Sequence, residues 1–141
     1  MYSRDYILRL IQQFGRTLIA LRNRLLGRQA DQAEMDAAIA EIARHAGLDL
    51  DIARRLDPPS LLMWLSPSED VDPSRMWLMA ELLYLAALAD APVRRRGDLE
   101  RALAIWERLP PDWKPSDDFP PVGERIDELR CLLESTDVSG L

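Results

Sequence analysis

The chain has 141 residues, of which 48% are hydrophobic and 30% are charged, and its formal net charge is −6. This composition is that of a globular domain with its own core, and it excludes an intrinsically disordered chain. The acidic balance argues against nucleic acid as a partner, because phosphates would be repelled. Cys131 is the single cysteine, so no intrachain disulfide can form; without a secretory signal pattern, we expect a cytoplasmic protein.

No segment alternates polar and apolar residues over a useful length, so we expect an all-α fold and one domain over residues 1–141. Prolines and glycines divide the chain into six to seven expected helices. These cover about residues 5–26, 32–46, 50–56, 59–65, 74–89, 99–109 and 122–135, followed by a frayed tail. The domain therefore consists of a basic amphipathic helix (1–28), a helical core (31–109), a proline-rich crossover (110–121) and a C-terminal helix (122–136).

The first 28 residues form a long amphipathic helix with six arginines and one acid, a formal charge of +5, against −11 for the rest of the chain. Its apolar stripe recurs in steps of four and three residues and consists of Ile7, Ile11, Phe14, Leu18, Leu21 and Leu25. Such spacing is typical of a helix that packs lengthwise on another helix. The stripe must be buried on the chain's own body or on a second copy, and we favour a homodimer. Gly15, beside Phe14, is expected to let another helix approach closely.

The segment from Met76 to Ala89 is apolar except for Glu81. A helix that is apolar on all sides is buried in a core or in a bilayer, and this one is too short to span a membrane. It is therefore the expected central helix, and no integral membrane segment is predicted. Glu81 either lies at an edge or beside an arginine, or it contacts a ligand or transfers a proton.

The residues from Leu82 to Leu109 follow the pattern of two nested antiparallel helices. The pattern consists of Leu82, Leu85, Ala86 and Ala89 on the first helix, Gly97 and Asp98 at the turn and cap, and Ala102 and Trp106 on the second. It resembles one degenerate tetratricopeptide repeat, with about four extra residues in the turn. Any groove of this hairpin could accept a peptide, unless the segment that contains Trp113 and Phe119 covers it.

With the start Asp5–Ile11, the chain is similar to a family of small uncharacterised bacterial proteins. The resemblance implies a tetratricopeptide-like helical-hairpin bundle and no known activity. The basic run Arg94, Arg95 and Arg96 is expected in an exposed loop at the hairpin turn, where it could hold an acidic partner.

The residues that usually carry chemistry are scarce. His45 is the single histidine and Cys131 the single cysteine, so a zinc site of the usual composition cannot form in one chain. The glycines form no phosphate loop or dinucleotide motif. We therefore expect no enzyme, no cofactor and no metal.

The leading interpretation is a noncatalytic protein-interaction or assembly module that self-associates. Its candidate interaction residues are the N-terminal stripe and Arg94–Arg96. Two alternatives stay open: reversible binding of a membrane surface through the basic first helix, and a small-ligand site around Glu81.

Overall fold

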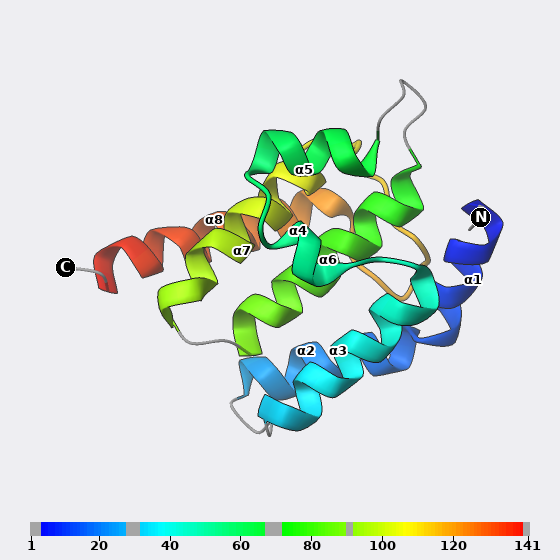
Figure 1. Cartoon of the computed structure of the whole chain (residues 1–141), viewed down its shortest axis with the longest axis horizontal. Coiled ribbons are helices and arrows are strands. Elements are labelled where there is room, and N and C mark those ends of the chain that lie inside the picture. Colours follow the sequence, from blue (N-terminus) through cyan, green and yellow to red (C-terminus); the bar gives the residue numbers. More distant parts are fainter. Residues whose placement is uncertain (1–3, 28–31, 67–71, 90–91, 140–141) are drawn as a thin grey trace.

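A computed structural model describes residues 4–27, 32–66, 72–89 and 92–139, and these residues form helices and no strand, which confirms the all-α class (Figure 1). The helical segments are α1 (Arg4–Gln13), α2 (Gly15–Leu26), α3 (Gln32–Ala46), α4 (Leu50–Ala53), α5 (Pro58–Leu65), α6 (Pro73–Ala89), α7 (Pro92–Trp106) and α8 (Val122–Ser139). The second half of α8 extends away from the other helices (Figure 1).

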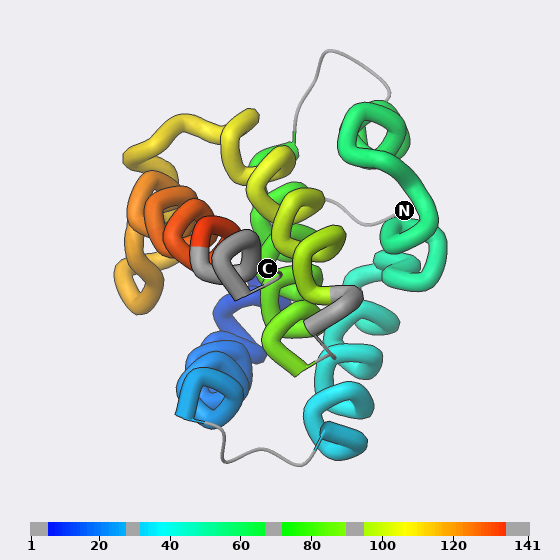
Figure 2. Tube along the Cα trace, turned by 90° about the vertical axis from the view of Figure 1, so that its left-hand side faces the viewer, coloured from blue at the N-terminus to red at the C-terminus, as the bar shows by residue number. Residues whose placement is uncertain are grey.

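Helix α6 is the centre of the fold, as the apolar run predicts. Every residue from Met76 to Ala87 is buried. Helix α7 packs along α6, and α1, α2 and α3 cover its other sides; Figure 2 shows α6 enclosed between these elements. Because each fully buried large apolar side chain stabilises a fold by about 1.5–3 kcal/mol, this helix organises the core.

The first expected helix is divided in two at Phe14, which corrects the continuous helix expected over 5–26. The backbone of Phe14 has φ −95° and ψ 6°, although the hydrogen bonds from Phe14 N–H to Leu10 and from Leu18 N–H to Phe14 continue at 2.8 Å. Gly15 begins α2, and a Cβ there would lie 3.8 Å from the Phe119 ring. The close neighbour of Gly15 is thus a ring of the proline-rich segment, so the expectation that another helix approaches here is wrong. Glycine also has a low helix propensity, which agrees with the break in the helix.

The turn between α6 and α7 lies earlier in the chain than expected. Helix α7 begins at Pro92 and runs through Gly97 and Asp98, so the turn expected at these two residues is wrong. Proline is favoured in the first turn of a helix, where its missing N–H has no partner to lose. Helix α7 also ends at Trp106, earlier than the expected Leu109. The tetratricopeptide-like arrangement stays a prediction.

Other ends differ by a few residues. Helix α4 ends at Ala53, whereas residues 50–56 were expected to be helical. Helix α8 continues to Ser139, where a frayed tail was expected from residue 136.

The proline-rich segment 110–121 crosses over the core without forming a regular helix. Phe119 is buried, and its ring meets the Trp77 ring edge-on with the centroids 4.8 Å apart. The segment therefore covers the first half of α6, beside Gly15. This contact with Trp77 explains why Phe119 is buried in a segment that is rich in proline and acidic residues.

Candidate functional site

The N-terminal stripe lies in the core of its own chain. The exposed fraction is at most 1% for Ile7, Ile11 and Leu18 and 4% for Leu21, whereas Phe14 and Leu25 are half-buried. Helices α1 and α2 pack on α6, and α1 also packs on α3. Of the two places left open by the sequence, the chain's own body is the one that covers the stripe. The four buried members of the stripe, Ile7, Ile11, Leu18 and Leu21, are not on the surface where a second copy or a membrane would meet them.

Glu81 belongs to a buried polar cluster that joins α2, α6 and α8. Arg125 Nη2 lies 3.4 Å from Glu81 Oε1, and Arg125 Nη1 lies 3.4 Å from Glu128 Oε2. Glu128 Oε1 also accepts a hydrogen bond from Arg22 Nη2 at 2.6 Å and a short one from the Tyr84 hydroxyl. The Arg125 guanidinium lies over the Tyr84 ring, 5.8 Å from its centroid. Two guanidinium groups thus balance two carboxylates.

The two carboxylates of this cluster have opposite pKa shifts. Burial raises the pKa of Glu81, and the charges of Arg125 and Arg22 offset only part of this effect. Burial also acts to raise the pKa of Glu128, but the Tyr84 hydrogen bond and the two arginines outweigh it, so this pKa is lowered. The pKa of the Tyr84 hydroxyl is raised by burial and by its bond to Glu128.

The inner part of the cluster, around Glu81 and Arg125, is buried and incompletely hydrogen-bonded, whereas Arg22 and Glu128 are 25% and 26% exposed. Glu81 is fully buried and Arg125 is 4% exposed. Glu81 Oε2 and the Nε atoms of Arg22 and Arg125 have no hydrogen-bond partner among the described residues. Buried pairs of this kind position the elements that carry them at a cost in desolvation. The arginine partner expected for Glu81 is therefore present, and it is Arg125, which the sequence did not indicate.

A second polar cluster fixes the α4 region to the middle of α7. Arg54 holds the buried Asp98 carboxylate with two hydrogen bonds of 2.7 and 3.2 Å. Arg101 lies 3.4 Å from the same carboxylate and donates to the Leu56 carbonyl at 2.7 Å. Asp98 was expected to cap a helix; instead it pairs with arginines inside α7.

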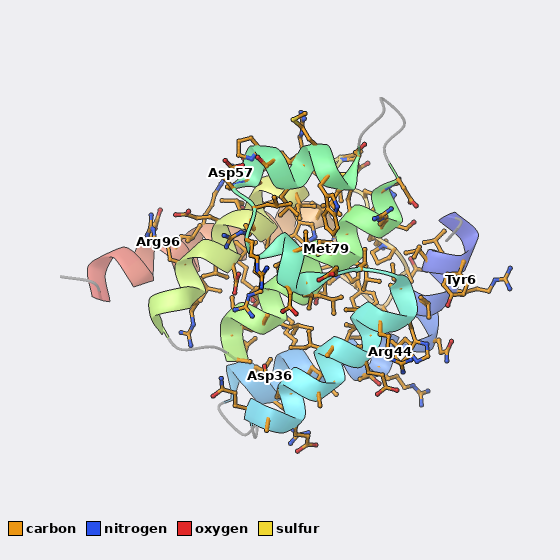
Figure 3. All side chains as sticks on the ribbon, viewed as in Figure 1. Tyr6, Asp36, Arg44, Asp57, Met79 and Arg96 are labelled. Carbon is orange, nitrogen blue, oxygen red and sulfur yellow. The ribbon has the colours of Figure 1, made fainter. Side chains whose placement is uncertain are left out.

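The three arginines expected in an exposed loop lie within α7. The Arg95 Nε donates to the Ala87 carbonyl at 3.1 Å, which ties the start of α7 to the end of α6. Arg96 pairs with Glu100 one turn further along α7, at 2.9 Å (Figure 3). The side chain of Arg94 lies outside the described part of the chain. The expectation of an exposed basic loop is thus wrong, because α7 begins at Pro92, before the three arginines.

Helix α5 is uncharged on its outer face as well as on its inner face. Leu61 and Leu65 are buried in the core, with 0% and 5% of their surface exposed. On the other side, Pro59, Ser60 and Met63 are exposed, and Met63 is 74% exposed; Leu62 is half-buried and packs against the core. No residue of α5 is charged. The helix lies at the edge of the molecule (Figure 1), where it packs on α7.

The hollows on the surface of the described residues include a cleft beside α3 and a groove beside α8. A cleft of about 600 Å³ runs between α3 and α4 and reaches Ala86 of α6. Asp36 and Arg44, two turns apart on α3, are among its lining residues (Figure 3). A groove of about 710 Å³ lies between the end of α7, the proline-rich segment and the start of α8. Glu81 lines neither hollow, so neither gives a ligand access to it.

The remaining candidates for chemistry are not gathered into a site. In residues 4–27, 32–66, 72–89 and 92–139, no three His, Cys, Asp or Glu side chains are grouped so that they could hold a metal ion. Cys131 is exposed on α8. His45, on α3, lies 3.9 Å from Glu41 through Nε2, and its carbonyl accepts a 3.0 Å hydrogen bond from the Tyr6 hydroxyl.

Within the described part of the chain, every helix is too short or too polar to cross a bilayer. The chain matches no protein-family model, and comparisons with curated proteins and with solved structures find no match.

Proposed function

We propose that the chain is a noncatalytic protein-interaction module that self-associates as a homodimer, with the outer face of α5 as its interface. The observation that carries the proposal is an exposed helix without charge in a chain that is 30% charged. This proposal replaces the N-terminal stripe as the expected interface, because most of the stripe is buried in the core of its own chain.

The spacing along α5 produces two uncharged faces. Leu61 and Leu65, four residues apart, form the face that packs inward. Pro59 and Met63, four residues apart, share the opposite side of the helix with Ser60, while Leu62 lies at the flank and packs against the core. Surface helices normally place charged residues on this side. Two outward apolar side chains, Pro59 and Met63, with no charged residue beside them are therefore better explained by a partner than by solvent.

A second copy fits this face on grounds of charge. Two copies that each carry a net charge of −6 repel, and contact is least costly where neither presents a carboxylate. A twofold axis would place α5 against α5, with the same residues on both sides. Met63 suits such a contact because the methionine side chain is flexible and adapts to an irregular surface. Interface cores are also depleted of charged residues.

The noncatalytic part of the proposal is supported by the position of Glu81. Its carboxylate is fully buried and already paired with Arg125, and it lines neither surface hollow. The membrane alternative has less support, because Ile7, Ile11 and Leu18 would have to leave the core before they could insert among lipids.

The test compares two variants that each place a carboxylate on an exposed apolar position. Met63→Asp lies on the outer face of α5; Leu26→Asp, at a side chain 44% exposed at the end of α2, is the matched control. We expect the wild type and Leu26→Asp to be dimers by light scattering after gel filtration. Met63→Asp should dissociate at least about tenfold more readily, because an unpaired charge enters an apolar contact. Equal masses for all three proteins, with unchanged helical circular dichroism, would refute the α5 interface.

A further inference from the structure

The second hollow of the surface has a chemistry of its own. We propose that the groove between α7 and α8 binds a basic, partly apolar segment of a partner protein. Its lining includes the apolar residues Leu109 and Ile126, the acids Asp112, Glu124 and Asp127, and Arg130. It involves no residue of α5, so the proposal is independent of the proposed self-association.

The rim of the groove carries an excess of negative charge. Glu107 pairs with Arg130 at 3.4 Å, and Arg130 is the single cation among the described residues that line the groove. Asp112, Glu124 and Asp127 are exposed and have no ion pair among the described residues. Three carboxylates thus face the opening without a positive partner from the described chain. An incoming segment with arginine or lysine side chains would supply these partners.

The base of the groove is apolar and its wall is fixed. Leu109 and Ile126 form the base and are 4% and 9% exposed. The wall is fixed by Gly123, whose N–H donates to the Pro111 carbonyl at 2.8 Å. A Cβ at Gly123 would lie 3.2 Å from this carbonyl oxygen, so the wall depends on the absence of a side chain. A wall held in place before binding loses little conformational entropy when a ligand enters.

The combination of rim and base selects one class of partner. Nucleic acid would be repelled by the carboxylates. A metal ion is disfavoured, because no group of three or more candidate ligands is found in the described residues. Arginine and lysine, in contrast, carry an aliphatic stem and a charged head. The stems would cover Ile126 and Leu109, and the heads would reach Asp112, Glu124 and Asp127.

The probe is a fluorescent peptide of about twelve residues with arginines and leucines on one helical face. Its binding is measured by fluorescence anisotropy in low salt. The groove variant is Glu124→Gln/Asp127→Asn. The control is Asp117→Asn/Asp118→Asn, which removes the same charge from two exposed residues of the proline-rich segment that do not line the groove.

We expect the wild type to bind and the groove variant to bind at least about fivefold more weakly, whereas the control changes affinity by less than about twofold. Replacing the peptide leucines by serines should also weaken binding, because the base is apolar. Met63→Asp should bind as the wild type does, so a failure of the α5 interface leaves this result unaffected. Absence of binding by the wild type, or equal losses in both double variants, would overturn the proposal.

Discussion

Replacing Arg125 by methionine should strongly destabilise the fold. The guanidinium is 4% exposed and lies 3.4 Å from the fully buried Glu81 carboxylate. Methionine retains most of the apolar volume, but it leaves the carboxylate without its hydrogen-bonded cation. Removing one partner of a buried pair costs about 3–5 kcal/mol, because an uncompensated charge stays in the core. We expect the free energy of unfolding of Arg125→Met to fall by this amount.

Glu81→Gln is the matched comparison. The amide oxygen can still accept a hydrogen bond from Arg125, and the guanidinium keeps Glu128 as its ionic partner at 3.4 Å. The expected change in unfolding free energy is therefore within about 1 kcal/mol. In the double variant Glu81→Gln/Arg125→Met, about 2 kcal/mol of the Arg125→Met loss should be recovered as coupling between the two sites.

Urea unfolding followed by circular dichroism at pH 7 measures all four proteins of this cycle. A loss for Arg125→Met that is the same in the wild-type background and in the Glu81→Gln background would refute the reasoning, because the cost would then come from lost packing. A loss below about 1 kcal/mol would show that the pair is not held in a desolvated core.

Three further predictions concern the glycines, the second polar cluster and pH. Gly15→Ala should raise the free energy of unfolding by about 0.4–1 kcal/mol, because φ of Gly15 is not positive and the added Cβ has room. Gly47→Ala should lower it by about 1–2 kcal/mol, because φ of Gly47 is 68°. Thermal melting of both variants should therefore show shifts of opposite sign. Arg54→Ala should lower stability by about 1–3 kcal/mol, since Asp98 loses two hydrogen bonds, and an unchanged melting temperature would contradict this account. Since the pKa of Glu81 is raised from 4.5, its contribution to stability is fully present below pH 4.5 and is lost as the pH rises through the folded pKa. The wild type should therefore lose stability relative to Glu81→Gln as the pH rises above 4.5, and a pH-independent difference in urea unfolding would argue against this.

The sequence predicts the elements that depend on local patterns. The apolar run from Met76 to Ala87 identifies the buried central helix, and the limits of α3 agree with the expected residues 32–46. The stripe from Ile7 to Leu21 is buried as its spacing requires. In each case the hydrophobic periodicity is enough, because burial of apolar side chains decides the outcome.

The features that the sequence does not predict depend on contacts between distant residues. Gly97 and Asp98 have the local character of a turn and a cap, but Asp98 pairs with Arg54, which is 44 residues away. Glu81 and Arg125 are also 44 residues apart, and Arg125 lies in a helix whose charges suggest exposure. No local pattern distinguishes a buried arginine from an exposed one.

The candidate interaction surfaces left a weaker signal in the sequence. The absence of charge over α5, from Pro58 to Leu65, was visible, but its inner and outer faces could be separated only once Leu61 and Leu65 were placed in the core. The α7–α8 groove joins acids from the proline-rich segment and from α8, which are neighbours only after Gly123 meets Pro111.

The solution mass of the intact wild-type protein, measured by light scattering over a wide range of concentrations, tests the central claim most directly. Self-association through α5 predicts a mass of twice the 16.1 kDa of one chain, falling toward one chain only on dilution. A mass of one chain at every concentration would contradict it.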